Sequence, residues 1–398
     1  MSFIPSAKGV IKIDLSALRH NFQVLDSLWP EGQGGIMPVI KSDAYGHGME
    51  TCARELGRMP VWGFGIYECS EARALREMGI RNRLFLLSGL LGDGPGDVLE
   101  LSLTVGVVKT GELSLLDRAA DGNGAKIRVH LKVDTGMGRF GLEPSELLDI
   151  VTAMHRWPNL HFQGLYTHMS SADSPDDPVN RMQVDEFRSV LGAVRDAGWE
   201  PELVHMANSA ALINLPETRF NLARPGIAIY GALCADPEIM TGFRPAMSFA
   251  SRLVQIRRFM PGSSFSYGHT FTCRRESLIG VVPVGYDNGY PRSLSNKASV
   301  LINGERCPIV GNICMRAFLV DVTDAADVRE GQEVVLIGRS GSEMIHVCEI
   351  AEKAGTISYE LLCLLGKLNK RVILEQDSGK PRAFCRRPAG EISNTCLE

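Results

Sequence analysis

Residues 36–48 read IMPVIKSDAYGHG, an apolar run followed by a lysine, a tyrosine and two glycines. The apolar run predicts a short buried strand, and a helix is expected to begin near Met49. Lys41 would then lie at the carboxyl end of a buried strand, where partial burial lowers the pKa of an amine and makes it a nucleophile toward an aldehyde. A lysine that extends from the strand end into solvent explains the same residues, so this stretch alone leaves the role of Lys41 open.

Short apolar runs continue after this first strand and alternate with stretches of helical periodicity, such as Pro144–Trp157 and Gln183–Gly198. Eight strand–helix alternations predict an α/β chain with a (β/α)8 barrel. An open doubly wound sheet has the same periodicity, but eight units and the lack of a glycine-rich dinucleotide motif after the first strand favour the barrel. The eight predicted strands are residues 37–41, 62–67, 83–88, 101–107, 127–134, 162–168, 203–207 and 222–230.

The pattern changes after Pro245, where strand-like runs dominate. Asn303-Gly304 joins two of these runs and is a strong hairpin signal. We therefore predict a barrel domain over residues 1–240, a mainly β C-terminal domain over 241–375 and a poorly ordered polar tail over 376–398. The runs are residues 248–256, 278–284, 299–302, 306–310, 317–322 and 333–337, with helical stretches near 344–354 and 359–367.

The composition excludes several classes of function. The chain has 398 residues and a net charge of −4, with no basic stripe that would indicate nucleic-acid binding. No apolar run reaches the roughly 18 to 20 residues of a membrane span, and residues 1–5 lack the pattern of a signal peptide. The ten cysteines show neither CxxC pairs nor metal-ligand spacing. They predict reduced thiols in a cytoplasmic protein without a metal site.

Two segments predict a phosphate-binding site. Residues 205–211 (HMANSAA) close the seventh strand and open a helix, and residues 223–227 (ARPGI) close the eighth. Asn208 and Ser209 are good N-cap residues, which is a sufficient structural explanation for them. Barrels often bind phosphate on the loops after strands seven and eight, and Gly226 lets a backbone N–H approach such a group. A ligand that carries a phosphate is therefore expected there.

A third segment, residues 130–141 (HLKVDTGMGRFG), ends the fifth strand. Lys132 and Asp134 alternate onto one face of that strand and are expected to point toward the barrel interior or its mouth. The glycines let the backbone approach a ligand, while Arg139 presents a fork of donors. A structural Lys–Asp pair beside a tight turn remains an alternative.

With these segments the chain resembles the alanine racemases, a family of fold-type-III pyridoxal-phosphate enzymes. About eight short motifs follow one another in the order of that family over residues 11–360. The resemblance implies racemisation of L-alanine and D-alanine with pyridoxal 5'-phosphate, which supplies D-alanine for peptidoglycan synthesis. The further motifs are residues 13–21 (IDLSALRHN), 164–169 (GLYTHM), 264–270 (SFSYGHT), 284–292 (VGYDNGYPR), 310–315 (VGNICM) and 356–359 (TISY).

The resemblance also assigns roles to residues. Lys41 and Tyr267 are implied as the two catalytic groups on opposite faces of a planar intermediate, with Tyr267 contributed by the partner subunit of a head-to-tail homodimer. Arg139 and the main-chain amide of Met315 are implied to hold the substrate carboxylate. The implied cofactor-binding residues are Lys41, Tyr45, Arg139, His168, Asn208, Ser209, Arg224, Gly226, Ile227 and Tyr359. The supporting residues are Lys132 (often carbamylated in the family), His205, Tyr286 and Arg292.

Arg224 bears on the type of reaction. The resemblance implies that Arg224 faces the pyridine nitrogen of the cofactor. Because an arginine stays protonated, that nitrogen stays unprotonated, and the ring is a weaker electron sink. Fast reprotonation, hence racemisation, is favoured. A network of His205 and Arg224 beside Tyr267 would lower the pKa of its phenol by stabilising the phenolate.

The sequence leaves the substrate open, because Arg316 follows Cys314-Met315 where the family commonly has an acid. If its guanidinium faces the pocket, cationic amino acids are disfavoured, and alanine and then serine are expected as substrates. If it points into the dimer interface or solvent, it selects nothing.

Four rival interpretations remain at this point. The first is a racemase of the same architecture for serine, lysine or many amino acids. The second is a decarboxylase of basic amino acids with the same barrel, although its His-x-Gly-Ser and Gly-Gly-Gly segments are missing. The third is a non-catalytic pyridoxal-phosphate-binding protein, disfavoured because a second domain carries Tyr267. The fourth is a binuclear metal hydrolase that uses a carbamylated lysine, His168 and His205, but Lys41 stands where such a site has His-x-His.

Overall fold

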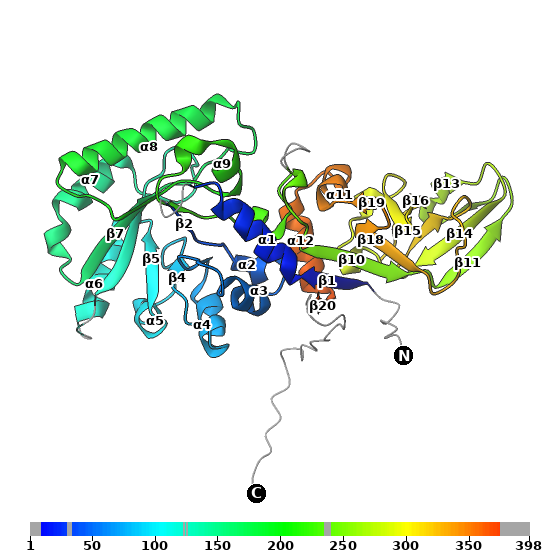
Figure 1. Cartoon of the computed structure of the whole chain (residues 1–398), viewed down its shortest axis with the longest axis horizontal. Coiled ribbons are helices and arrows are strands. Elements are labelled where there is room, and N and C mark those ends of the chain that lie inside the picture. The colour runs from blue at the N-terminus through cyan, green and yellow to red at the C-terminus, as the bar shows by residue number, and fades with distance from the viewer. Residues whose placement is uncertain (1–8, 30–33, 122–123, 125, 235–239, 375–398) are drawn as a thin grey trace, which may run out of the picture.

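The computed structural model describes residues 9–29, 34–121, 124, 126–234 and 240–374, so the tail predicted over 376–398 lies outside the described residues. The chain forms two units side by side, a barrel surrounded by helices and an elongated domain rich in strands (Figure 1). Helices α11 (Val347–Ala354) and α12 (Ser358–Leu368) lie where the two units meet (Figure 1).

The barrel is closed by eight parallel strands. Six of them pair in the order β3-β4-β5-β6-β7-β8, and β2 pairs with β9. A bridge between Val39 and Gly65 joins the end of β2 to β3, and the amide of Asn221 donates to the carbonyl of Val204 over 3.2 Å, which joins β9 to β8. The predicted (β/α)8 barrel is confirmed, and the open sheet is wrong. The strands are β2 (Gly35–Ile36), β3 (Phe64–Ile66), β4 (Leu84–Leu86), β5 (Leu103–Val107), β6 (Ile127–Lys132), β7 (Leu160–Tyr166), β8 (Leu203–His205) and β9 (Leu222–Ala223).

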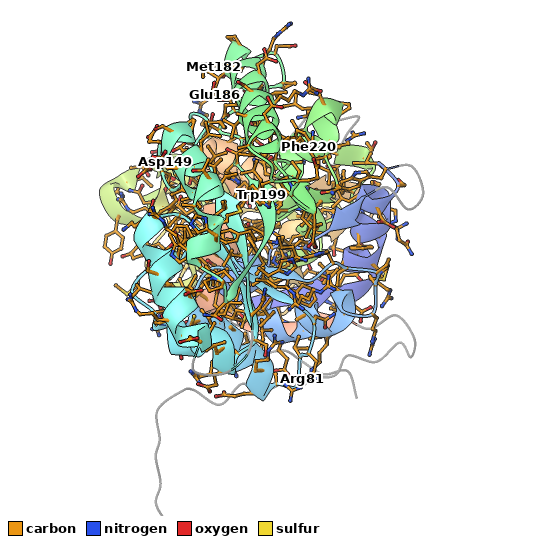
Figure 2. All side chains as sticks on the ribbon, turned by 90° about the vertical axis from the view of Figure 1, so that its left-hand side faces the viewer. Arg81, Asp149, Met182, Glu186, Trp199 and Phe220 are labelled. Carbon is orange, nitrogen blue, oxygen red and sulfur yellow. A yellow bond between two sulfur atoms is a disulfide. The ribbon has the colours of Figure 1, made fainter. Side chains whose placement is uncertain are left out.

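Helices cover the outside of the barrel, and Met182 and Glu186 of α8 point away from it (Figure 2). Helix α8 begins five residues before the predicted stretch, because Pro178 occupies its first position and the Asp177 side chain accepts from the amide of Val179. The helices of this layer are α1 (Leu15–Asp26), α3 (Met49–Leu56), α4 (Cys69–Glu77), α5 (Pro95–Glu100), α6 (Thr110–Asp121), α7 (Pro144–Thr152), α8 (Pro178–Asp196) and α9 (Ser209–Asn214).

The second unit is built on one long sheet of order β11-β14-β17-β16-β15-β18-β10-β1-β20. The predicted strand over 248–256 is wrong as a single element. It is two strands, because Leu253 turns into the core while Val254 is exposed, and β10 and β11 then pair with different partners. The strands are β10 (Met247–Arg252), β11 (Gln255–Phe259), β14 (Ser277–Val282), β15 (Ser299–Ile302), β16 (Glu305–Val310), β17 (Phe318–Asp321), β18 (Glu333–Ser340) and β20 (Lys370–Leu374).

Two features of this sheet bear on the sequence interpretation. Asn303 and Gly304 both have positive φ, 51° and 85°, and join β15 to β16 as the predicted hairpin. Strand β1 (Val10–Asp14) lies within the range predicted for the barrel, yet it pairs antiparallel with β10 and parallel with β20. Its alternate residues Ile11 and Ile13 are fully buried, so this register buries its apolar face.

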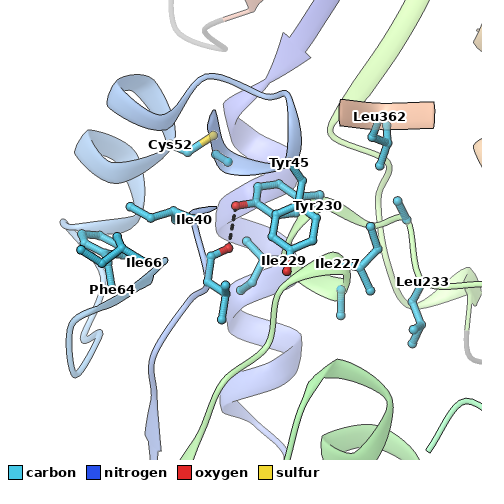
Figure 3. Close-up of a cluster of buried hydrophobic side chains, with 14 of the residues drawn as sticks. Ile40, Tyr45, Cys52, Phe64, Ile66, Ile227, Ile229, Tyr230, Leu233 and Leu362 are labelled. Carbon is cyan, nitrogen blue, oxygen red and sulfur yellow. Dashed lines mark hydrogen bonds between the residues drawn. The ribbon is translucent and has the colours of Figure 1, made fainter. Parts of the chain in front are cut away.

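A cluster of buried side chains supports the end of β2 (Figure 3). The hydroxyl of Tyr230 donates to the carbonyl of Val39 over 3.0 Å, and its ring lies 5.2 Å from that of Tyr45. Ile40 is fully buried in the same cluster. The backbone directly before Lys41 is therefore held in a packed environment.

One cysteine prediction is wrong. Cys234, after the last barrel strand, and Cys348 in α11 form a disulfide, so the ten cysteines are not all reduced thiols. Sequence spacing could not reveal this pair, because 114 positions separate the two residues. Within the described part of the chain, Cys52, Cys69, Cys273, Cys307, Cys314 and Cys363 are free. None of the described helices is long and apolar enough to cross a membrane.

Candidate active site

Lys41 is the first residue of a short helical segment, α2 (Lys41–Tyr45), whose backbone is unusual. Four consecutive residues, 42–45, have φ between 53° and 55°, the left-handed region that costs roughly 1–2 kcal/mol per residue outside glycine. Tertiary contacts hold this turn: Glu71 accepts from the amide of Ser42 over 2.7 Å, and Asp43 forms an ion pair with Arg371. The expected helix at Met49 follows as α3, and the left-handed turn lies between Lys41 and that helix.

The Lys41 side chain lines a cavity of about 270 Å³ at the carboxyl ends of the barrel strands. The cavity contains four cationic side chains, and the described residues that line it include no carboxylate. Burial, and then the charge of Arg139, lower the pKa of Lys41. The cavity is lined by Val39, Lys41, Tyr45, Tyr67, Leu87, Ser88, Lys132, Arg139, Phe140, Tyr166, His168, Asn208, Ser209, Arg224, Gly226, Ile227 and Tyr359. All ten predicted cofactor-binding residues are among them.

One end of the cavity presents hydroxyl and amide groups. The amides of Gly226 and Ala228 donate to Oγ of Ser209 over 2.9 and 3.2 Å. A Cβ on residue 226 would lie 2.4 Å from the hydroxyl of Tyr45, so only glycine allows this approach. The rings of Tyr45 and Tyr359 lie 5.9 Å apart. Oγ of Ser209 accepts from both amides and keeps its own O–H to donate, so the hydroxyls of Ser209, Tyr45 and Tyr359 suit the oxygens of a phosphate.

Arg224 and His205 form a buried network below the cavity. Nη1 of Arg224 donates to Nδ1 of His205 over 2.6 Å, and Nη2 donates to the carbonyl of Thr167. Nε2 of His205 lies 2.7 Å from Nδ1 of His130, and the ring of Tyr166 stacks on His205 at 4.7 Å. Burial lowers the pKa of Arg224 to about 10, so it stays cationic at neutral pH. The pKa of His205 is far below its ordinary value, through burial and then Arg224, so the imidazole is neutral.

Lys132 and Asp134 have different surroundings. Burial, followed by the charges of Arg224 and Arg139, lowers the pKa of Lys132 to about 7. The carboxylate of Asp134 instead accepts from the amides of Gly136 and Arg139, over 2.9 and 3.1 Å, and closes the turn. Asp134 therefore has a structural role in the tight turn, as the alternative interpretation predicted for it. Lys132 instead lines the cavity.

Comparison with known proteins places this geometry in a family. The model of the alanine racemase N-terminal domain matches residues 13–234, and that of the alanine racemase C-terminal domain matches residues 246–373. The chain belongs to the alanine racemase family. It is 37% identical over 374 residues to the alanine racemase of Geobacter sulfurreducens, covering 93% of this chain and 98% of that protein.

Two further comparisons also match alanine racemases. The alanine racemase of Halothermothrix orenii is 39% identical over 357 residues, covering 88% of this chain and 93% of that protein. The crystal structure of alanine racemase from Streptomyces lavendulae is 34% identical with a TM-score of 0.86, covering 92% of this chain and 97% of that chain. Membership of the alanine racemase family removes the decarboxylase and metal-hydrolase interpretations.

The second-domain residues that the family motifs single out do not reach this cavity within one chain. Tyr267, Met315 and Tyr286 are 74%, 55% and 43% exposed, and neither they nor Arg292 line the cavity around Lys41. Tyr267 begins η4 (Tyr267–His269), directly before β13 (Phe271–Thr272), which lies at the end of the second domain away from the barrel (Figure 1). The two halves of the predicted site are therefore apart in a single chain.

Arg316, which departs from the common family pattern, is paired within its own chain. Its Nε lies 2.9 Å from Oδ2 of Asp287, with the two side chains 73% and 44% exposed. The positive charge next to Met315 is thus partly neutralised by a neighbour.

Sequence reasoning missed several residues of the site. Tyr166 stacks on His205, and Nζ of Lys41 lies 5.0 Å from the ring centre of Tyr67. Tyr166 stands two residues before His168 in the strand predicted over 162–168, so period-two alternation could have placed it on the same face. The position of Glu71 gave no such signal, because its contacts with the Lys41 turn are tertiary.

Proposed function

We propose that this member of the alanine racemase family interconverts L-alanine and D-alanine with pyridoxal 5'-phosphate, using Lys41 and Tyr267 as the two acid–base groups. The observation that carries the proposal is the cationic cavity around Lys41, where all ten predicted cofactor-binding residues meet. Its two guanidinium groups, together with two amines whose pKa values are lowered, suit a ligand that brings both a phosphate and a carboxylate.

The cavity fits the cofactor in its donor set. The hydroxyl of Ser209, which the amides of Gly226 and Ala228 hold in place, and the hydroxyls of Tyr45 and Tyr359 would hold the phosphate. The guanidinium of Arg224 would face the ring nitrogen. Lys41, with its lowered pKa, would hold the aldehyde carbon. When bound, pyridoxal phosphate delocalises the electron pair that remains on Cα after the proton leaves.

The residues of the chain supply the remaining chemistry. Arg139 holds the substrate carboxylate by its fork of donors, together with the main-chain amide of Met315. Lys41 accepts or returns the Cα proton on one face, and Tyr267 acts in the same way on the other face. Arg224, kept cationic and held by His205, does not give a proton to the ring nitrogen, which favours rapid return of the proton to Cα.

A homodimer with shared sites follows from the position of Tyr267. Inversion requires acid–base groups on opposite faces, and the exposed phenol of Tyr267 lies away from the cavity of its own chain. We infer that Tyr267, Met315, Tyr286 and Arg292 enter the cavity of a second chain, and that Tyr286 and Arg292 line its entrance. The exposure of these side chains supports this arrangement.

We also propose the cellular context and the domain limits. D-alanine made here would serve peptidoglycan synthesis in the cytoplasm, a location that the six free thiols of the described residues favour and in which the Cys234–Cys348 disulfide is unusual. The barrel and the β domain are proposed to divide at residues 240 and 241, with the β domain ending near 375. Alanine is the proposed substrate, ahead of serine.

Subunit mixing tests the shared site. Lys41→Ala and Tyr267→Phe should each be inactive, whereas a mixed population should recover part of the activity, because one site of each hybrid dimer carries neither substitution. Lys41→Ala should also lose the visible absorbance of the bound cofactor. An absence of recovery after verified subunit exchange would contradict the shared site, and activity retained by Lys41→Ala would contradict the role of Lys41. Rates with alanine, serine and lysine would settle the substrate.

A further inference from the structure

The loop that carries Tyr267 has a strained backbone. It runs between β12 (Ser264–Phe265) and β13, and Ser266, Gly268 and His269 have φ values of 67°, 74° and 47°. Positive φ at Ser266 and His269 is unfavourable for residues with a side chain, so contacts must offset its cost. One lies within the loop, where Oγ of Ser264 is 2.9 Å from Nδ1 of His269, and others come from outside it. The side chain of Tyr267 itself is mostly exposed.

Asn312 supplies the central contact. Its Nδ2 donates to the carbonyl of Tyr267 over 2.6 Å, and its own carbonyl accepts from Oγ of Ser266 over 2.9 Å. The neighbouring Gly311 has a φ of 75°, and a Cβ there would lie 2.7 Å from Cβ of Ser266. The loop of Tyr267 and the segment after β16 are thus in direct contact through two hydrogen bonds.

Asn296 makes a second connection at the other end of the loop. Its Oδ1 accepts from the amide of Gly311 over 2.6 Å, and its Nδ2 donates to Oγ1 of Thr270 over 3.1 Å. The two asparagines therefore join both ends of the Tyr267 loop to one short segment. Met315, three residues after Asn312, belongs to the same segment.

We propose that Asn312 is a positioning residue, which fixes the backbone of Tyr267 to the segment of Met315 so that both enter the partner cavity as one unit. This inference rests on the proposed function, because it concerns the orientation of the Tyr267 phenol in the active site. The amide donor is the essential feature. Asn312→Asp keeps the size of the side chain but places a carboxylate oxygen against the carbonyl of Tyr267, which repels it.

The expected effect is on the rate of proton transfer at one face. Small displacements of an acid–base group lower kcat strongly, and we expect Asn312→Asp and Asn312→Ala to lose about 30-fold in kcat with KM changed less than about twofold. Exchange of the Cα proton with deuterated solvent should slow for only one enantiomer of alanine, the one whose proton Tyr267 removes. Titration of the apoprotein with pyridoxal phosphate, followed by its visible absorbance, should give the same affinity as the native chain.

A double-mutant cycle separates positioning from general damage. In a Tyr267→Phe background, Asn312→Asp should add less than about a twofold loss, measured as the residual proton exchange of the enantiomer that Tyr267 serves, because the group it positions is already absent. The matched control is Asn303→Asp. Asn303 lies in the hairpin between β15 and β16, and its side chain likewise donates to a main-chain carbonyl, that of Ala326, so this variant loses an equivalent donor and should keep native rates.

Three outcomes would overturn the inference. Multiplicative losses in the cycle, equal slowing for both enantiomers, or an Asn312→Asp enzyme as active as Asn303→Asp would each show that Asn312 does not act through Tyr267. Native activity in Tyr267→Phe alone would instead remove the proposed role of Tyr267, and this inference with it.

Discussion

Arg224 donates a hydrogen bond to His205 inside the barrel, from Nη1 to Nδ1 over 2.6 Å. Because a guanidinium can only donate, Nδ1 of His205 must be unprotonated and its proton must reside on Nε2, 2.7 Å from Nδ1 of His130. The proton of His130 then resides on its own Nε2. The cation at the base of the cavity thus sets the tautomers of two buried histidines.

Removing this acceptor should destabilise the barrel. In His205→Leu, a buried N–H of Arg224 loses its partner, and the free energy of unfolding should fall by about 2–3 kcal/mol. Urea denaturation of the apoprotein measures the change. His155→Leu is the control, because His155 is exposed and should alter stability by less than about 0.5 kcal/mol. Equal stability of the two variants would mean that Arg224 finds another acceptor.

Gly226→Ala should weaken cofactor binding. The new Cβ would approach the hydroxyl of Tyr45 to 2.4 Å, so the tyrosine or the loop must shift at the proposed phosphate end. We expect affinity for pyridoxal phosphate to fall at least about tenfold, or 1.4 kcal/mol, in a titration of the apoprotein. Gly192→Ala in α8, with no atom within 4 Å of the new Cβ, should bind as the native chain does. Unchanged affinity in Gly226→Ala would place the phosphate elsewhere.

Lys132 should make stability depend on pH. Its pKa falls from 10.5 to about 7 on folding, so between these values the unfolded chain binds more protons than the folded chain. The destabilisation from Lys132 is therefore complete below pH 7 and disappears as the pH rises toward 10.5. Relative to Lys132→Met, the native apoprotein should gain stability from pH 6 to pH 9, measured by denaturant unfolding in buffer free of carbon dioxide. If the difference in free energy of unfolding between the two proteins stays constant with pH, Lys132 has an ordinary pKa in the folded chain.

Arg316 should have little influence on substrate choice. Its charge is paired with Asp287, and exposed pairs contribute about 0–1 kcal/mol. Arg316→Ala should change the ratio of alanine to lysine racemisation less than about threefold, as measured from kcat/KM for both substrates. A collapse of that ratio would show that the guanidinium acts on the substrate pocket despite Asp287.

The disulfide should contribute to stability. Cys234 and Cys348 connect the barrel to α11 across 114 positions, and cross-links of long loops typically stabilise by about 2–4 kcal/mol. Reduction should therefore lower the midpoint of thermal unfolding, while the same reductant should leave Cys348→Ser unchanged. An identical response of both proteins would mean that the pair does not limit unfolding.

The sequence predicted those parts of the molecule that depend on local pattern. The alternation of strands and helices identified the barrel, and the ends of its strands indicated Lys41 and the phosphate loops, where barrel sites form. The other cavity residues, such as Tyr45, His168 and Tyr359, came from the resemblance to the alanine racemases. The left-handed turn of residues 42–45 was not predictable, since none of these residues is glycine and Glu71 and Arg371 hold them from distant elements. The disulfide was missed for the same reason, as its partners are close only in the folded chain.

The position of β1 has a consequence for how the chain folds during synthesis. This strand is made before the rest of its sheet, because its neighbours β10 and β20 follow more than 230 and 350 residues later. The large sheet is therefore completed only after nearly the whole chain has left the ribosome. A fragment that begins at residue 240 would lack β1 and leave the edge of β10 open to association with other chains. A division of the chain at residues 240 and 241, as proposed above, would thus not separate two independent folding units.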